Sequence, residues 1–402
     1  MIPGPGVLAL ESSIDPRAAA GAIITGDLSS ELLAACVRYS VGAGTPLEVA
    51  EAARRFDDWS GLLIAAEKHG LLPRMAGCFD ACDVGAPDQI LSTLELAFRE
   101  NAKRVFVMSV ELTRICQRLE AENIPALAIK GPVTAHTLYD DPAYRVFCDL
   151  DIFVPREHLT DARKILSDCG YQPSGASRIG IARFTELSLE NAANGIHIDL
   201  HWELTPPDWY VSMPDGMWER TRRVAILGCE VQTLGEEDTF LHLCIHGAKH
   251  GWSSFNWLVD LCSLTGRSPG IVGRSLALLD PKSRAIPMVW FGLAAVAVLL
   301  PNQAASSRIN IPHHLRALAQ KTVRNTLSGA MRDETVFTRL AFQWSIGGNR
   351  LAICRFIFRR LFIPNQDDWS TLPIRHRRLL FLLVPWRLVR RTWEVISTAA
   401  RA

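Results

Sequence analysis

The sequence predicts an α+β protein in which a small mixed β-sheet is flanked by helical regions on both sides. Apolar residues recur at helical spacing up to about residue 120, short strand-like and helix-like segments alternate between residues 124 and 203, and helical spacing returns after about residue 235. The chain has 402 residues, 48% of them hydrophobic and 21% charged, which is typical of a folded globular protein with a substantial core.

Residues 1–120 are predicted to form a helical N-terminal region without chemistry of its own. Ser29, Ser30 and Glu31 resemble the start of a helix. Two longer stretches, Glu48–Leu72 and Leu94–Glu120, carry apolar residues on one helical face. We expect this region to pack on the segments that follow.

Residues 121–235 are predicted to form the α/β core. A buried strand at 125–129 runs into a turn at Lys130-Gly131-Pro132, and further segments follow in the order helix, strand, helix, strand, strand. Their expected ranges are a helix at Val133–Tyr139, a strand at Val146–Val154, a helix at Arg156–Cys169, and strands at Phe184–Leu189 and Ile196–Glu203.

Residues 236–348 are predicted to form a helical C-terminal domain, and residues 349–402 a basic amphipathic helical tail. The clearest helical segments are Glu236–Gly247, Trp252–Thr265, Pro287–Leu300 and Glu334–Phe358. The apolar run 286–300 is shorter than the roughly 20 residues of a membrane-spanning helix, so we interpret it as a buried core helix.

The charge of the chain is unevenly distributed. The formal net charge is +1, but residues 350–402 carry a net +8 and the remainder −7. This acidic body argues against nucleic acid as a partner. The tail combines arginines with leucines and tryptophans, so it is predicted to pack on the body, to dock on a partner protein or to contact a membrane surface. The sequence begins without a secretory signal pattern, which predicts a cytoplasmic protein, with peripheral membrane association as an alternative.

Two strands carry carboxylates at alternating positions. Asp149 and Asp151 lie on the same face of one strand because successive side chains alternate, and they are about 7 Å apart along it. Asp199 lies on the polar face of the strand at 196–203, between His197 and His201. If the strands are neighbours, three carboxylates surround one point, and such an oxygen-rich site suits Mg²⁺, with Mn²⁺ as an alternative.

The turn after the first strand is predicted to bind phosphate. A strand, a glycine and a helix in succession present free N–H groups to an anion, and Gly131 allows close approach. Lys130 adds positive charge. Arg145 is predicted either to do the same or to pair with Asp140 or Asp141.

These motifs together resemble a known family. The segments Ala128–Gly131, Leu138-Tyr139, Arg145, Asp149–Asp151, Gly170-Tyr171 and His197–Trp202 look like those of the uncharacterised bacterial nucleotidyltransferase-like family (nucleotidyltransferase family 5 type) in the DNA polymerase β superfamily. The resemblance runs from about residue 30 to 300. It implies a nucleotidyltransferase core with Asp149 and Asp151 as metal ligands on one strand and Asp199 on the next but one. It also implies transfer of a nucleoside monophosphate from an NTP, with ATP as the expected donor, and release of pyrophosphate.

The resemblance also points to two residues after the sheet. Lys249-His250-Gly251-Trp252 and Trp257-Leu258-Val259-Asp260 match a family stretch that follows the sheet. This implies that Lys249 contacts phosphates and that Asp260 acts as a base or positions a hydroxyl, with a purely local role for Asp260 as the alternative. His201 is a further candidate for contact with the acceptor or for the base. His242, His246 and His250 recur every four residues, but the outer two lie about 12 Å apart on a helix and cannot share one ion.

The sequence therefore predicts a Mg²⁺-dependent nucleotidyltransferase whose acceptor is a small molecule, a peptide or a protein. The phosphate turn departs from the Gly-Ser or Gly-Gly of active superfamily members, because Lys130-Gly131-Pro132 stands there. Phosphoryl or glycosyl transfer from a nucleotide-activated donor is therefore one alternative. A non-catalytic module that binds nucleotide or docks on a partner is the other.

Overall fold

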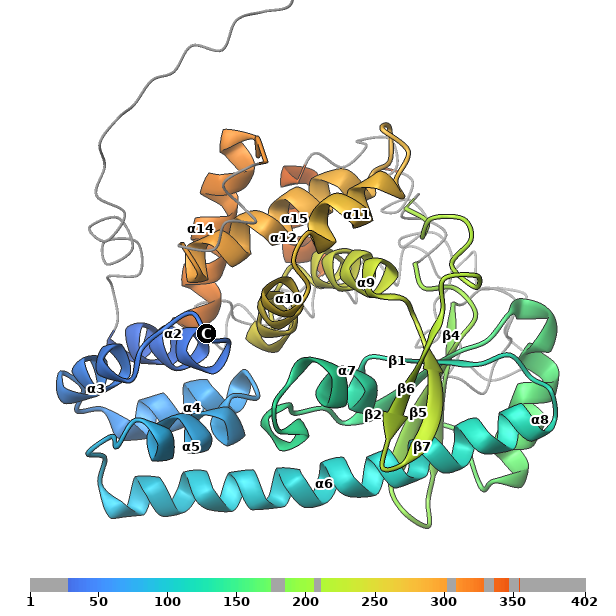
Figure 1. Cartoon of the computed structure of the whole chain (residues 1–402), viewed down its shortest axis with the longest axis horizontal. Coiled ribbons are helices and arrows are strands. Elements are labelled where there is room, and N and C mark those ends of the chain that lie inside the picture. Colours follow the sequence, from blue (N-terminus) through green and yellow to red (C-terminus); the bar gives the residue numbers. More distant parts are fainter. Residues whose placement is uncertain are drawn as a thin grey trace, which may run out of the picture.

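The computed structural model describes residues 28–174, 185–205, 211–301, 309–328 and 336–346, together with Cys354. Apart from Cys354, the predicted tail at 349–402 lies outside the described residues. The α+β fold class predicted from the sequence is confirmed, since a small mixed sheet is flanked by helices that precede and follow it in the chain (Figure 1).

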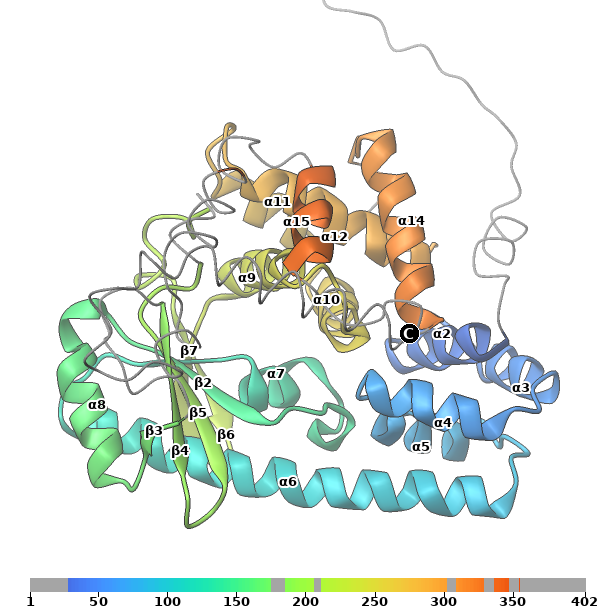
Figure 2. The ribbon, with the colours of Figure 1, turned by 180° about the vertical axis from the view of Figure 1, so that it is seen from behind.

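The N-terminal part of the described chain is helical. Its helices are α2 (Leu28–Ser40), α3 (Pro46–Arg54), α4 (Trp59–Lys68), α5 (Leu72–Ala81) and α6 (Asp88–Ala121). The long α6 passes along the molecule beneath α4 and α5 at one end and beneath the sheet at the other (Figures 1 and 2). It thereby connects the helical half of the molecule to the sheet.

The predicted helical stretch Glu48–Leu72 is two helices. α3 begins with a capping box, in which the Thr45 side chain accepts a hydrogen bond from the Glu48 N–H, and it ends at Arg54. The Asp58 side chain then accepts a hydrogen bond of 3.0 Å from the Gly61 N–H and starts α4. The Asp58 cap therefore starts a second helix inside a stretch whose apolar spacing is continuous, so that spacing alone does not reveal the break.

The sheet has five strands in the order β1-β2-β5-β4-β3. The strands are β1 (Leu127–Ile129), β2 (Asp149–Phe153), β3 (Gln172–Pro173), β4 (Glu186–Asn191) and β5 (Ile196–His201). β2 and β5 are parallel and every other neighbouring pair is antiparallel, so the sheet is mixed as predicted. Between the strands lie α7 (Gly131–Leu138), α8 (Leu159–Asp168) and the short 3₁₀ helices η1 (Pro142–Tyr144) and η2 (Arg156–His158).

One face of the sheet is apolar and covered. Leu150 and Ile152 of β2 and Ile198 of β5 are fully buried, and they belong to one apolar cluster with side chains of α6 and α8. Because side chains alternate along a strand, the aspartates of the same strands must project from the opposite face. Packing of α6 and α8 thus decides which way the carboxylates point.

A two-stranded hairpin was not predicted. β6 (Arg222–Ile226) pairs antiparallel with β7 (Cys229–Thr233), and the hydroxyl of Thr233 donates a 2.7 Å hydrogen bond to the Ala128 carbonyl in β1. The turn residues Leu227 and Gly228 both have positive φ, as a tight hairpin turn requires. Leucine is not a typical residue of such turns, which obscured this hairpin in the sequence.

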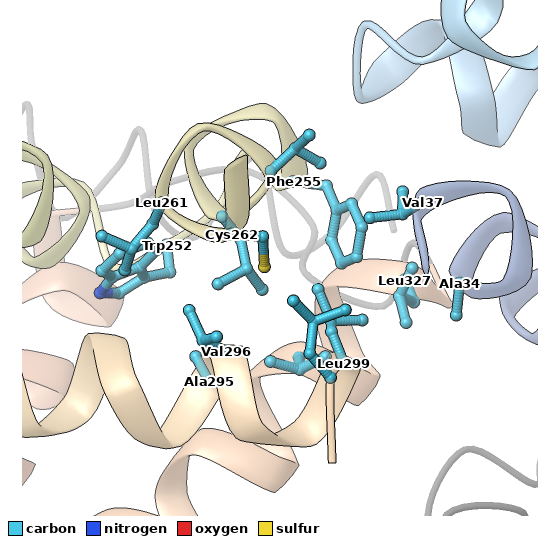
Figure 3. Close-up of a cluster of buried hydrophobic side chains, with 14 of the residues drawn as sticks. Ala34, Val37, Trp252, Phe255, Leu261, Cys262, Ala295, Val296, Leu299 and Leu327 are labelled. Carbon is cyan, nitrogen blue, oxygen red and sulfur yellow. The ribbon is translucent and has the colours of Figure 1, made fainter. Parts of the chain in front are cut away.

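The C-terminal part is helical again. It contains α9 (Glu236–Lys249), α10 (Phe255–Arg267), α11 (Ile271–Ala277), α12 (Ala285–Leu299), α14 (His313–Leu327) and α15 (Val336–Ser345). Figure 3 shows that side chains of α2, α10, α12 and α14 meet in one apolar cluster. The helical regions before and after the sheet therefore share a core. The apolar run at 286–300 is the buried helix α12, as predicted.

None of the helices among the described residues combines the length and the apolarity that are needed to cross a membrane.

Candidate functional site

The predicted carboxylates come together where β2 and β5 run side by side. The register pairs Asp151 with Asp199 and Asp149 with His197, so three carboxylates lie on the polar face of two adjacent parallel strands. The condition for bringing the three carboxylates together, that these strands are neighbours, is met. The rigid ladder fixes the spacing of the carboxylates before any ligand binds.

Three of these side chains are close enough to share an ion. One ligand atom each from Asp151, Asp199 and His201 lies within 4.8 Å of the other two. Among the described residues, no other group of three or more histidine, cysteine or acidic side chains is this close together. His201 was predicted as an acceptor or base candidate, and the structure places it in the cluster. Asp149 is not a member of the group.

Asp151 lies at the centre of a chain of charges. Its Oδ1 accepts hydrogen bonds from Lys130 Nζ at 2.9 Å and from His201 Nε2 at 2.9 Å. The residue is 5% exposed. Burial by itself raises the pKa of a carboxyl group, but the two cationic neighbours outweigh it and hold the pKa of Asp151 well below its usual range. Asp151 is therefore ionised in the folded protein.

Glu186 adds a further charged side chain to this row of ion pairs, and the sequence analysis did not identify it. Its Oε2 lies 3.3 Å from Nδ1 of His201, so the ring has a carboxylate at each nitrogen. Burial disfavours the imidazolium, but both carboxylates favour it and raise the pKa of His201 to about 9. The hydrogen bond to His201 lowers the pKa of Glu186 to about 2. The alternation of polar and apolar residues in Glu186–Glu190 was the available signal, since it places Glu186 on a polar face.

Asp149 shows that the site holds more negative charge than its cations balance. Burial and then the charges of Asp151 and Asp199 raise the pKa of Asp149 to about 6. A bound cation relieves such repulsion, and carboxylate oxygens are the ligands that Mg²⁺ prefers. The donor set thus fits the predicted ion, which Asp151 and Asp199 would hold with Asp149 or His201 beside them.

The predicted phosphate turn lies next to these carboxylates. β1 ends at Ile129, Lys130 is the N-cap residue of α7, and the helix begins at Gly131 with φ +43°. A Cβ at Gly131 would lie 3.3 Å from the Asp149 carbonyl oxygen, so the turn packs tightly against the start of β2. Pro132 removes one N–H group from the first turn of α7, which leaves fewer donors for an anion than a Gly-Ser turn offers.

Arg145 and Asp260 bind each other in the structure. The guanidinium donates from Nε to Oδ1 at 2.9 Å and from Nη2 to Oδ2 at 2.8 Å, and Asp260 is fully buried. The structure thus leaves neither side chain free for the predicted roles of phosphate ligand and base. The alternative partners of Arg145 are engaged elsewhere, because Asp140 pairs with Arg267 and Asp141 caps Ala143.

Helix α9 faces the polar side of the sheet. The pKa of His242 is lowered to about 3, first by burial and then by the nearby charge of Lys130, which shows that this ring lies beside the site. Lys249, at the end of α9, lowers the pKa of Glu186 through its charge. Lys249 therefore lies near Glu186, and its predicted contact with phosphates stays a prediction. The rings of His246 and His250 are tilted by 46° to each other with their centroids 4.7 Å apart, and both contact Trp257.

Comparisons with known proteins show which family the chain belongs to. A family described as uncharacterised nucleotidyltransferase matches residues 56–279, more than half of the chain. No curated protein matches. The crystal structure of an antigenic nucleotidyltransferase-like protein from Paracoccidioides brasiliensis aligns with a TM-score of 0.31 and 14% identity over 50% of this chain and 93% of that chain, a similarity too low to support an argument. On the extent of the family match, the chain belongs to the uncharacterised nucleotidyltransferase family.

Proposed function

We propose that this protein transfers a nucleoside monophosphate from an NTP, with ATP as the expected donor, to an acceptor in a Mg²⁺-dependent reaction. The observation that carries the proposal is the alignment of Asp151 with Asp199 on adjacent parallel strands, with Asp149 beside them and the phosphate turn next to β2. In the reaction, a nucleophilic atom of the acceptor bonds to the α-phosphorus. The bond from the α-phosphorus to the bridging oxygen breaks, and pyrophosphate leaves.

We assign some residues of the site to the donor nucleotide and its metal ion, and one to the acceptor. Asp149, Asp151 and Asp199 are the proposed ligands of Mg²⁺, which when bound neutralises phosphate charge. The start of α7 at Gly131 and the ammonium groups of Lys130 and Lys249 are the proposed contacts of the donor phosphates. The proton of the acceptor passes to a carboxylate on this face, and Asp199 is the candidate because it is half-buried and accessible.

Binding is the first test. Thermal unfolding is measured with ATP, CTP, GTP, UTP and UDP-glucose, each with and without Mg²⁺. A nucleotide present at 100 times its Kd stabilises the folded state by about 2.7 kcal/mol. We expect stabilisation by one NTP that requires Mg²⁺, that disappears in Asp199→Asn and that persists in Asp168→Asn, an exposed aspartate on α8. Equal stabilisation of wild type and Asp199→Asn contradicts the proposed site.

The second test identifies the transferred group, and it distinguishes nucleotidyl transfer from phosphoryl or glycosyl transfer. The Lys130-Gly131-Pro132 turn, with its missing N–H at Pro132, favours phosphoryl or glycosyl transfer as the second candidate. ATP labelled at either the α- or the γ-phosphate is incubated with protein and fractionated small molecules, peptides and proteins. Nucleotidyl transfer moves the α-label and releases pyrophosphate, whereas phosphoryl transfer moves the γ-label. Stabilisation by UDP-glucose alone indicates glycosyl transfer.

A partner protein or membrane surface for residues 349–402 stays a prediction, since that segment lies outside the described residues apart from Cys354. Truncation near residue 370 with liposome-binding measurements tests it independently. A docking module loses liposome binding on truncation and is unaffected by Asp199→Asn, whereas an enzyme shows the reverse.

A further inference from the structure

Lys130 has a backbone conformation that is rare for a residue with a side chain. Its φ is 54° and its ψ is −147°, a region that is favourable essentially for glycine alone. The neighbouring Gly131 also has positive φ. A lysine at this position costs conformational free energy that a glycine does not, so its side chain must contribute something at this place in the turn.

The contribution is a positive charge on Asp151. The ammonium group lies 2.9 Å from Oδ1, and the Lys130 side chain is 15% exposed against 6% for Asp151. His201 approaches the same oxygen at 2.9 Å. Two cationic groups therefore share one carboxylate oxygen, on the face where Asp149 and Asp199 supply further negative charge. The ammonium group of Lys130 is thus a positive charge of the protein itself, and it lies beside Asp151 where a divalent ion would otherwise bind.

The same lysine belongs to the phosphate turn. Its carbonyl oxygen accepts the hydrogen bond from Thr134 N–H at 3.2 Å in the first turn of α7, so its backbone is part of the expected donor site. Lysine carries a single charge on a flexible stem of four carbons, which can reach alternative anions from one backbone position. Asp151 and a phosphate group bound at the start of α7 are two such anions. A divalent cation on Asp151 repels the ammonium group of Lys130 toward the phosphate group.

We propose that Lys130 is an exchangeable internal cation, which neutralises Asp151 in the free protein and moves to the donor phosphates when nucleotide and metal bind. This inference rests on the proposed function, because it needs an anionic donor and a metal at the same carboxylates. Its consequence is coupling between the two ligands. Lys130 opposes metal binding in the free protein, and nucleotide removes that opposition.

The test measures metal binding directly, without turnover. Mn²⁺ is titrated into the protein and free Mn²⁺ is followed by electron paramagnetic resonance, first alone and then with α,β-methylene ATP. The variants are Lys130→Met, which removes the charge, and Lys130→Gly, which also suits the backbone conformation and keeps the test available if the methionine variant unfolds. Lys164→Met is the matched control, since Lys164 is an exposed lysine on α8.

We expect Lys130→Met and Lys130→Gly to bind Mn²⁺ alone at least tenfold more tightly than wild type, and Lys164→Met to bind like wild type. The nucleotide analogue is expected to tighten Mn²⁺ binding more in wild type than in the Lys130 variants. Equal or weaker Mn²⁺ binding in both Lys130 variants overturns the inference and leaves the proposed function intact. Absence of Mn²⁺ binding in wild type and in every variant, with nucleotide present, or binding that is unchanged in Asp199→Asn, instead contradicts the proposed function itself.

Discussion

Arg145 and Asp260 form a buried, two-point ion pair that joins the entrance of β2 to helix α10. The hydroxyl of Tyr139 donates a third hydrogen bond to the Asp260 carboxylate, and the guanidinium of Arg74 lies over the Tyr139 ring at 4.5 Å from its centroid. Three segments that are distant in the sequence meet here, at Arg74, at residues 139–145 and at Asp260. The candidate site is thus tied through one polar network to both helical regions.

This pair predicts a large loss of stability on substitution. Asp260→Asn leaves the buried guanidinium without a countercharge, so we expect unfolding free energy to fall by about 3–5 kcal/mol, as is typical when one partner of a buried pair is removed. Urea unfolding followed by circular dichroism measures it. Arg99→Met is the control, because Arg99 and Glu95 form an exposed pair on α6 worth about 0.3–0.5 kcal/mol. Wild-type stability combined with lost transfer activity would return Asp260 to its predicted role as a base.

Gly131 predicts a combined effect on stability and binding. Alanine there meets both positive φ and the Asp149 carbonyl oxygen at 3.3 Å from the added Cβ. We expect Gly131→Ala to cost more than the roughly 1 kcal/mol of a positive-φ position alone and to weaken nucleotide-dependent stabilisation. Gly195→Ala separates the two causes, since Gly195 has φ +70° and open space around its Cβ position. Equal costs for the two variants would show that the contact with Asp149 is unimportant.

His242 predicts a dependence of stability on pH. The residue is 4% exposed, and neither ring nitrogen has a hydrogen-bond partner among the described residues. Its pKa is about 3 in the folded protein, against 6.5 ordinarily. The charged groups near it are Asp151 and His201 from the sheet, Lys130 from the turn before α7 and Lys249 from its own helix.

The unfolded chain therefore binds a proton at His242 between pH 6.5 and 3 that the folded protein does not bind. Unfolding free energy falls as the pH drops through this window, by at most about 1.4 kcal/mol per pH unit from this group. His242→Leu lacks this contribution, so its stability curve should separate from that of wild type below pH 6.5. The exposed His313→Leu serves as control. Parallel curves for wild type and His242→Leu are the opposing result, measured by urea unfolding at several pH values.

Glu111 predicts a second, independent loss of stability in acid. Its carboxylate accepts hydrogen bonds from Arg114 at 2.6 and 2.8 Å and from the Tyr171 hydroxyl at 2.7 Å. Burial raises its pKa, but these partners prevail and hold the pKa below its usual 4.5. The stabilisation is thus present above pH 4.5 and is lost as the pH falls through the folded pKa.

Glu111→Gln should therefore be less stable than wild type at pH 7, by about 1–2 kcal/mol, because Arg114 is partly exposed and its charge is screened. The difference should shrink in unfolding experiments at pH 3. A difference that stays constant from pH 7 to pH 3 would mean that hydrogen-bond geometry, and not the charge of Glu111, matters.

The local pattern of the sequence was sufficient for the fold class and for the carboxylates. Alternation within a strand depends only on neighbouring residues, so it placed Asp149 and Asp151 on one face and Asp199 on the polar face of its own strand. The same pattern in Glu186–Glu190 contained Glu186, but nothing local indicates which histidine it meets. The hairpin of β6 and β7 was missed because its strands are short and Leu227 occupies its turn.

The sequence by itself determined which side chains share a face, where the turn between β1 and α7 lies and how the charge is divided between body and tail. Only the tertiary structure decided which charged side chain pairs with which. Lys130 and His201 meet at Asp151 because β1 and β5 both flank β2, and Arg145 meets Asp260 because α10 packs beside the entrance to that strand. Such partners are separated by up to 115 residues. Strand order and helix packing bring them together, and no periodicity along the chain encodes that arrangement.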